Sequence, residues 1–342
     1  MITPNNILII RTDRIGDVIL SLPLAALIKK HFPKCKVSFL LKEYTKDLVS
    51  DHPYIDDVLI LQENNGKIPI FTNVNRLKSK YFDASIIVYP TFITALIIFL
   101  SRIKFRIGSG YRWYSFLFNK RIYEHRKYAE KHELEFNVSL LQIFGIRESI
   151  SPMNVEFNIG INNAKLEKVK NLLTESGVDL NRKLVIAHPG SSGSAIDLPP
   201  EKFSRLVKNL TKLENTTLII TGSADETDIC TTVALESNVI NYAGQFDLSE
   251  LTALISLCDV FISNSTGPIH IAVALGIFVV GFYPKIQACS PERWGPYTSK
   301  KVIFMPEIEC FDCTREQCER LNCMSSINIE QVTEEISKIL SE

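Results

Sequence analysis

The sequence predicts an α/β protein made of two doubly wound domains with largely parallel sheets. Short apolar runs, typical of strands buried on both faces, alternate with longer segments of helical period. That alternation favours parallel strands joined by helices. The length of 342 residues suits two domains of ordinary size. The periodicity lapses between Phe144 and Gly160, and we place the domain boundary there.

The first half of the chain begins with an expected strand at residues 6–10, followed by an expected helix from Val18 to Lys30. The longest apolar stretch, residues 85–100, is interrupted by polar residues and a proline and falls short of the roughly 20 residues of a membrane span. It is therefore interpreted as a buried strand followed by a helix. Other strands are expected at residues 36–41, 58–61, 84–89 and 103–108.

The second half repeats this pattern. A helix is expected at residues 164–176, and strands are expected at residues 183–187, 217–221, 258–263 and 278–282. Turns of small and polar residues follow three of these strands. Because open α/β sheets bind ligands at the carboxyl ends of their strands, these turns are candidate binding loops.

The turn after residues 258–263 carries the strongest local signal. Ser265 and Thr266 are good N-caps, and Pro268 fits a first helical turn. The helix start leaves backbone N–H groups and the positive dipole end exposed, while Gly267 has no Cβ to block a diphosphate. His270 lies one turn further on and is expected near the same anion site. A well-capped helix without a ligand, and a core histidine, are the alternatives.

Two further loops share that sheet edge. The small-residue loop after residues 183–187 can wrap a phosphate with backbone N–H groups and hydroxyls. In the turn after residues 217–221, an acid can accept hydrogen bonds from ribose hydroxyls. The expected donor-binding residues of these two loops are Gly190, Ser191, Ser192, Gly222 and Glu226. Each loop alone is equally compatible with an ordinary flexible connection.

The charge distribution is uneven although the net charge is zero, with 38 basic and 38 acidic residues. Residues 1–150 hold 22 Lys and Arg against 14 Asp and Glu. Residues 102–131 combine basic and aromatic side chains, among them Arg112, which suits an anionic glycolipid or membrane headgroups. A partly buried loop is the alternative, and single-stranded nucleic acid would use similar residues. The overall balance argues against a nucleic-acid partner.

The cysteines fall into two groups. Those at positions 35, 230, 258 and 289 are interpreted as small apolar residues. The remaining four lie within 14 residues: Cys310, Cys313, Cys318 and Cys323. Free thiols are the default interpretation of that group, and a structural zinc site or a labile disulfide is the alternative. No signal peptide is apparent, and we expect a cytoplasmic protein.

The motifs together resemble glycosyltransferase family 9, the bacterial heptosyltransferases of lipopolysaccharide core synthesis. The resemblance covers essentially the whole chain and depends on residues 9–17, 188–192, 222–226 and 265–270. It implies a GT-B architecture of two Rossmann-like domains facing across a cleft. Residues 1–155 would bind the acceptor and residues 156–327 the nucleotide sugar. Residues 328–342 would form a helix that packs back on the first domain.

The resemblance also assigns site residues. The Gly-Asp carboxylate of the family, its general base, falls on Asp17, which would take a proton from the acceptor hydroxyl. Asp13 is the rival base, and helix capping is the structural alternative for Asp17. Asp13, Arg14 and Gly16 would lie on the acceptor side with Arg112. On the donor side, the diphosphate would lie against residues 265–268, and Phe246 would contact adenine.

The chain also departs from the family pattern. Many relatives carry Lys or Arg where this chain has Ile196, so a cation expected to neutralise the leaving diphosphate is missing. Lys202 and Arg14 are the candidate substitutes. We therefore expect an inverting transferase that moves a heptose from an ADP-sugar to a lipopolysaccharide core or related glycolipid at the inner face of the cytoplasmic membrane. It would need no cofactor. The alternatives are a non-catalytic nucleotide-sugar binder and a GT-B enzyme such as a UDP-sugar epimerase.

Overall fold

The computed structural model describes residues 2–235, 237, 239–309 and 313–341. The chain forms two compact units. The first comprises Met1–Arg126 and Glu133–Gly160, and the second comprises Lys127–His132 and Ile161–Glu342. The main division falls between Gly160 and Ile161, and residues 127–132 of the first half belong to the second unit.

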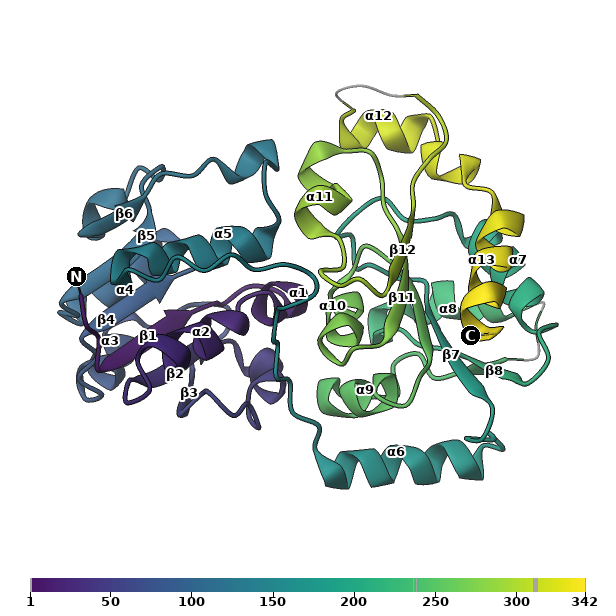
Figure 1. Ribbon diagram of the computed structural model, residues 1–342, viewed down its shortest axis with the longest axis horizontal. Coiled ribbons are helices and arrows are strands. Elements are labelled where there is room, and N and C mark those ends of the chain that lie inside the picture. Colours follow the sequence, from purple (N-terminus) through teal and green to yellow (C-terminus); the bar gives the residue numbers. More distant parts are fainter. Residues whose placement is uncertain (1, 236, 238, 310–312, 342) are drawn as a thin grey trace. The chain divides into compact units, whose positions relative to one another are not determined.

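The first unit is built around a six-stranded, fully parallel sheet (Figure 1). Its strands are β1 (Asn6–Ile10), β2 (Lys36–Leu41), β3 (Asp57–Ile60), β4 (Ala84–Ile87), β5 (Phe105–Ser109) and β6 (Lys120–Ile122). The order β3-β2-β1-β4-β5-β6 is that of a Rossmann fold, with the strand order reversing between β1 and β4. The central strand β1 is apolar and buried because helices cover both faces of the sheet.

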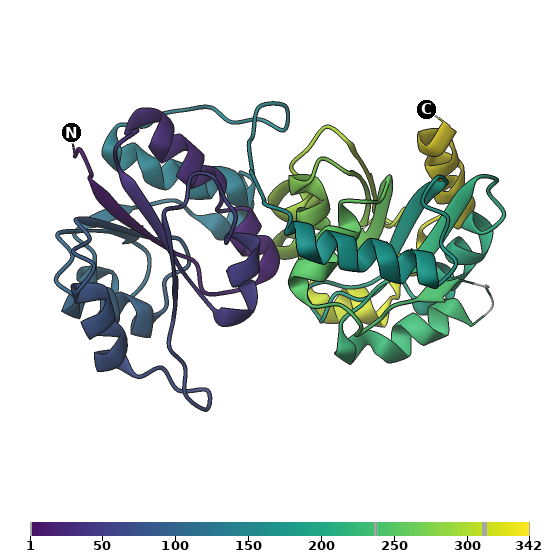
Figure 2. The same ribbon diagram turned by 90° about the horizontal axis from the view of Figure 1, so that it is seen from below.

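Helices lie on both sides of this sheet, as Figure 2 shows from below. They are α1 (Ile15–Ile19), α2 (Pro23–His31), α3 (Ile70–Lys78), α4 (Phe92–Leu100) and α5 (Glu133–Ser139), with short 3₁₀ turns at η1 (Glu43–Leu48), η2 (Ser115–Leu117) and η4 (Leu140–Phe144). A further 3₁₀ turn, η3 (Arg126–Tyr128), begins at the last residue of this part of the first unit and continues into the second. The single helix expected from Val18 to Lys30 is wrong. Pro23 begins a separate helix because it has no N–H to donate to Ile19.

The second unit has the same topology. Its parallel sheet contains β7 (Lys183–His188), β8 (Thr216–Ile220), β9 (Ile240–Asn241), β10 (Val260–Asn264), β11 (Phe278–Phe282) and β12 (Lys301–Phe304). The order β9-β8-β7-β10-β11-β12 again reverses beside the first strand, here between β7 and β10. The prediction of two doubly wound α/β domains is therefore confirmed.

The helices of the second unit form two layers, with α9 and α10 on one side of the sheet and α7, α8 and α13 on the other (Figure 1). They are α6 (Asn163–Glu175), α7 (Pro200–Leu210), α8 (Thr227–Ala234), α9 (Leu248–Ile255), α10 (Gly267–Ala274), α11 (Pro291–Trp294), α12 (Arg315–Arg320) and α13 (Ile329–Ser341), with 3₁₀ turns at η5 (Ala224–Glu226), η6 (Gln287–Cys289) and η7 (Cys323–Ser326).

The C-terminal helix α13 packs on α7 within the second unit, and its expected packing on the first domain stays a prediction. Its apolar face, formed by Ile329, Val332 and Ile336, joins the core that contains Phe203 and Leu206 of α7. A helix with one apolar stripe buries that stripe against its nearest apolar neighbour, and α7 provides it. Among the described residues, no helix combines the length and the apolarity needed to cross a bilayer.

Candidate active site

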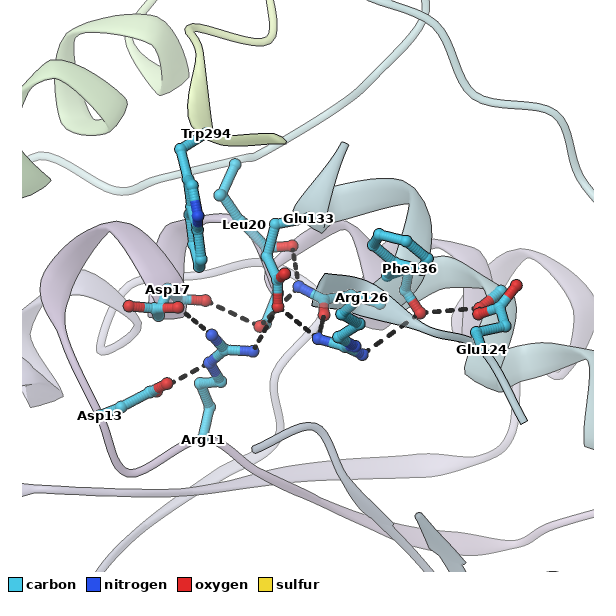
Figure 3. A network of polar contacts seen from close by, with 12 residues as sticks. Arg11, Asp13, Asp17, Leu20, Glu124, Arg126, Glu133, Phe136 and Trp294 are labelled. Carbon is cyan, nitrogen blue, oxygen red and sulfur yellow. Dashed lines mark hydrogen bonds and ion pairs between the residues drawn. The ribbon is translucent and has the colours of Figure 1, made fainter. Parts of the chain in front are cut away.

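The first unit concentrates charge where its strand order reverses, immediately after β1. Arg11 follows the last residue of β1, and its side chain is 1 % exposed. Its Nε donates to Asp13 at 2.7 Å, one terminal nitrogen donates to Asp17, and the other lies 3.7 Å from Glu133 of α5 (Figure 3). The buried guanidinium is thus surrounded by three carboxylates, and that arrangement compensates the burial of a cation.

The clustering of these charged groups changes the pKa values of Asp13 and Arg11. The pKa of Asp13 is raised to about 6, first by burial and then by the nearby charge of Asp17, although Arg11 opposes the rise. The guanidinium of Arg11 has a raised pKa because the attraction of Asp17, Asp13 and Glu133 outweighs its burial. A raised pKa makes the Asp13 carboxylate a better proton acceptor than an ordinary aspartate, so Asp13 stays a candidate base beside Asp17.

The other residues predicted on the acceptor side lie around the same strand ends. Arg14 is exposed and is the N-cap of α1 with an extended backbone, while Gly16 is buried inside that helix. Arg112 is exposed in the segment after β5. Next to it, Trp113 stacks on Phe92 of α4 with ring centroids 5.0 Å apart. Whether these residues contact an acceptor stays a prediction.

The second unit brings two predicted loops together at its own point of strand reversal. Asn264, the last residue of β10, donates through its amide to the carbonyl of Pro189 at 2.6 Å. Its amide oxygen accepts from the N–H of Leu198 at 2.9 Å. One buried side chain therefore ties both ends of the 189–198 loop to the start of α10. Asn264 was not predicted, because an Asn at a strand end gives no sequence signal for contacts 66 and 75 residues away.

The helix α10 begins as the sequence predicted. Thr266 is its N-cap with an extended backbone, but its side chain makes no capping hydrogen bond, and Pro268 lies in the first turn. Ser265 and Gly267 are partly exposed. The first N–H groups of this helix therefore have no capping side chain from Thr266, which leaves them available to an anion.

His270 lies in the first turns of α10 and is 5 % exposed. Burial, together with the nearby His132, lowers its pKa to about 3, so the ring is neutral. Its Nδ1 is buried and has no hydrogen-bond partner among the described residues. A neutral imidazole with an unused ring nitrogen can hydrogen-bond to a ligand without adding charge.

Glu226 organises the Gly190 loop. Its Oε1 accepts from the N–H and the hydroxyl of Ser192 at 2.9 and 3.0 Å, and its Oε2 accepts from the N–H and the hydroxyl of Ser223 at 2.8 and 2.9 Å. A Cβ at Gly190 would lie 2.2 Å from Cδ of this carboxylate, so only glycine allows the approach. Both oxygens of the predicted ribose acceptor are thus already engaged in holding loops.

The remaining predicted donor positions surround this carboxylate. Ser191 is buried, and Gly222 is packed so closely that an added Cβ would lie 2.5 Å from Sγ of Cys230. Gly244, in the loop after β9, donates to the carbonyl of Gly222 at 2.9 Å. This contact holds the half-buried Phe246 beside Tyr242, with ring centroids 5.3 Å apart. Their contacts with a nucleotide stay predictions.

The cation that lies on the loop of Ile196 is neither Lys202 nor Arg14, the two substitutes that the sequence suggested. Ile196 packs against the apolar core, and Nζ of Lys202 donates to the carbonyl of Ile327 at 3.2 Å. Arg315 of α12 instead donates to the carbonyls of Gly193 and Ala195 at 3.1 and 3.0 Å. A guanidinium therefore lies on the loop that lacks its own cation. Arg315 was not predicted here, because it is more than 100 residues away from this loop along the chain.

The cysteine group is only partly described, because Cys310 lies outside the described residues. Cys318 and Cys323 are buried in a small apolar cluster with Ile286, and Cys313 packs against it. Within the described ranges, no three His, Cys, Asp or Glu side chains are grouped as metal ligands. The zinc alternative stays a prediction.

Comparison with known proteins identifies the relatives of this chain. Residues 71–324 match the model of glycosyltransferase family 9 (heptosyltransferase). The lipopolysaccharide core heptosyltransferase OpsX of Haemophilus influenzae is 25 % identical over 86 % of this chain and 83 % of its own length. A family 9 glycosyltransferase of Veillonella parvula has a similar structure, with a TM-score of 0.83, 18 % identity, and coverage of 98 % of this chain and 97 % of its own.

A further solved structure is the ADP-heptose lipopolysaccharide heptosyltransferase II of Escherichia coli, with a TM-score of 0.78, 19 % identity, and 98 % of each chain covered. Two Rossmann-like units of identical strand order, together with the likeness to these two solved structures, show the GT-B fold. The chain belongs to glycosyltransferase family 9, the heptosyltransferase family.

Proposed function

We propose that this enzyme transfers a heptose from an ADP-sugar to the core of a lipopolysaccharide or a related glycolipid, with inversion at the anomeric carbon. The observation that carries the proposal is the Arg11 cluster, which holds Asp17 at the strand reversal of the first unit. The family membership and the similarity to the E. coli ADP-heptose lipopolysaccharide heptosyltransferase II support this donor and acceptor.

The second unit is proposed to bind the ADP-sugar. The diphosphate would accept hydrogen bonds from the uncapped N–H groups at the start of α10, where Gly267 permits close approach. Arg315 would supply the positive charge that Ile196 does not, because its guanidinium is already fixed on the same loop. His270 would hydrogen-bond to phosphate or sugar through its unused nitrogen.

The proposed reaction is a single displacement. An acceptor hydroxyl oxygen forms a bond to the anomeric carbon, the bond from that carbon to the diphosphate oxygen breaks, and ADP leaves with the electron pair. The hydroxyl proton goes to a carboxylate oxygen of Asp17 that Arg11 does not occupy. A positioned base of this kind contributes a factor of about 10²–10⁴ to the rate.

The proposed location is the surface of the cytoplasmic membrane. Trp113 and Phe116 are 73 and 63 % exposed, and exposed basic residues such as Arg112 and Arg121 lie in the same segment. Aromatic rings suit the interfacial zone of a bilayer, and cations are attracted to anionic headgroups. Exchanging both aromatic residues for serine should weaken binding to vesicles that contain anionic lipid. Phe71→Ser, at an equally exposed aromatic residue of α3, should leave binding unchanged.

The transfer is tested with labelled ADP-heptose and a heptose-deficient lipopolysaccharide. Wild-type protein should label the lipopolysaccharide, and Asp17→Asn should slow transfer by about 10²–10⁴ while ADP still binds in calorimetry. Asp47→Asn, at an exposed aspartate of η1, is the matched control and should retain full activity. If the Asp17→Asn protein kept its transfer activity, Asp17 would not be the general base.

One observation favours a second candidate function, a non-catalytic nucleotide-sugar binder. Ile196 stands where many relatives carry a cation, and the neighbouring Asp197 adds a carboxylate whose pKa burial raises to about 6. In the transfer assay, tight ADP-sugar binding with no labelled lipopolysaccharide would support this candidate. Release of the sugar or its epimer without acceptor would instead indicate epimerase-type chemistry.

A further inference from the structure

A chain of polar contacts in the first unit links α1, which carries Asp17, to α5. Glu133 begins α5 and accepts a hydrogen bond from Arg126, which also donates to the amide oxygen of Asn137 at 3.1 Å. The amide of Asn137 donates to the carbonyl of Leu20 at 3.0 Å and approaches the hydroxyl of Ser21 at 3.4 Å.

The chain of contacts closes on itself at Asp17. The hydroxyl of Ser21 donates to the backbone carbonyl of Asp17 at 2.8 Å, while Arg11 donates to the Asp17 carboxylate and lies 3.7 Å from Glu133 (Figure 3). We call this closed set the Asp17 ring: Arg11, Glu133, Arg126, Asn137, Ser21 and Asp17. It holds both the backbone and the side chain of the proposed base.

Glu133 is the central charge of this ring. Its side chain is 3 % exposed, and it lies between the two cations, Arg11 and Arg126. Burial of a carboxylate at such a position is costly unless it is paired and hydrogen-bonded, and here both cations face it. Glu133 therefore attracts Arg11 in competition with Asp17. Arg126 weakens this attraction because it neutralises part of the charge of Glu133.

Other charged and titratable groups also face this site. Asp13 of the loop after β1 accepts from Nε of Arg11. Tyr44 of η1 donates to the backbone carbonyl of Asp13 and lies close enough to Arg14 to respond to its charge. On the strand side, the guanidinium of Arg11 lies 6.0 Å from the ring centroid of Tyr89. Within the Asp17 ring, Glu133 and Arg126 are the charged residues that lie outside the β1–α1 segment. Their charges influence how strongly Arg11 interacts with Asp17.

We propose that Glu133 is a positioning residue for the transfer reaction: balanced by Arg126, it fixes Arg11 so that this guanidinium holds one oxygen of Asp17 and leaves the other for the acceptor hydroxyl. Figure 3 shows the second carboxylate oxygen of Asp17 turned away from these contacts. The inference rests on the proposed function, because it assigns a role to residues around the proposed base.

The two outer residues of the ring should affect the base in opposite directions. Removing the charge of Glu133 leaves Arg11 more fully to Asp17, which stabilises the carboxylate and makes it a weaker base. Removing Arg126 leaves the charge of Glu133 uncompensated, so Glu133 draws Arg11 away from Asp17. If Glu133 and Arg126 only supported the fold, their replacement would not change the basicity of Asp17 in opposite directions.

The test compares the pH dependence of kcat in the wild type, Glu133→Gln and Arg126→Ala. For Glu133→Gln we expect kcat to fall by about 10–100-fold, the KM for ADP-sugar to stay within about twofold of the wild type, and the acid limb to move to lower pH by roughly half a unit. For Arg126→Ala the acid limb should move to higher pH. Arg126→Lys, which keeps the charge, should restore the wild-type profile.

The control is Glu148→Gln, which removes a carboxylate and its ion pairs with Lys30 and His31 in the same unit, away from the Asp17 ring. It should leave the pH profile unchanged. Since the side chain of Arg126 is only partly buried, its variants keep the test informative if Glu133→Gln does not fold. Circular dichroism establishes folding in each case.

The outcomes separate the two proposals. If the wild type transfers no sugar, the proposed function fails before any variant is measured. If the wild type is active but Glu133→Gln keeps the wild-type kcat and acid limb, or if the limb moves the same way in Glu133→Gln and Arg126→Ala, the positioning role is overturned. Opposite shifts, with restoration by Arg126→Lys, establish it.

Discussion

Replacement of Glu226 by glutamine should loosen the donor loops of the second unit. The carboxylate accepts two backbone N–H groups, one from Ser192 and one from Ser223, and the hydroxyl of each residue. In Glu226→Gln, one acceptor oxygen becomes an NH₂ group. The facing serine hydroxyl can rotate and accept from it, but the facing backbone N–H cannot. The unpaired N–H and the weakening of the other hydrogen bonds should together lower the free energy of opening these loops by about 2–4 kcal/mol.

Hydrogen exchange of the whole chain measures this effect locally. The amide hydrogens of Ser192 and Ser223 should exchange about 30–1,000 times faster in the variant at pH 7, which is the same free energy expressed as a ratio. Asp225→Asn, at the exposed acid one residue before, is the matched control and should change stability by less than about 0.5 kcal/mol. Equal exchange in the two variants would refute the assignment of Glu226 as the organiser of these loops.

The pH dependence gives a second check on the same residue. Burial alone would raise the pKa of Glu226, but the hydrogen bonds from Ser223, the charge of His188 and the hydroxyl of Ser192 lower it overall. A lowered pKa in the folded state means that the carboxylate stabilises the protein above the ordinary glutamate value of 4.5. This contribution is lost as the pH falls through the folded value. The difference between the wild type and Glu226→Gln should therefore shrink below pH 4.5.

Three further predictions concern the second unit. Gly190→Ala forces a Cβ against Glu226 and should weaken ADP binding by about tenfold or more in calorimetry. Ile336→Ala removes a buried side chain of α13 and should destabilise the unit by about 2–5 kcal/mol in thermal unfolding, whereas the exposed Glu334→Ala should have little effect. Burial raises the pKa of Asp197 from 3.8 to about 6, so its deprotonation lowers the stability as the pH rises from 3.8 to about 6, and the loss is complete above that range. Asp197→Asn should therefore raise Tm at pH 8 but not at pH 4.

Much of the fold was predictable because its central strands are apolar on both faces. Strands β1, β2, β7, β10 and β11 follow runs in which nearly every residue is buried, and such runs stand out in a sequence. The short strands β6, β9 and β12 were not predicted. All three lie at sheet edges, where a strand needs few apolar residues and its ends depend on pairing with a neighbour.

The candidate site was predictable where function depends on local backbone geometry. The helix start at Thr266 and Pro268 and the glycine at position 190 are visible in the sequence because turns and close approaches select those residue types. Arg126 and Glu133 were hidden, since their roles depend on contacts between separate elements. One sequence feature could have indicated Glu133, because it is an acid that follows a strongly basic segment and begins a helix.

The two strand reversals have the same topology but opposite electrostatics, and this difference supports a division of roles. In the first unit, carboxylates gather around one buried cation, as a site for proton transfer requires. In the second unit, the Glu226 carboxylate is occupied by the N–H and hydroxyl groups of Ser192 and Ser223. Burial favours the neutral form of Asp197 by raising its pKa to about 6, and the buried His270 is neutral because its pKa is lowered to about 3. A diphosphate near an unshielded carboxylate would be repelled, so the second arrangement suits an anion and the first suits a base.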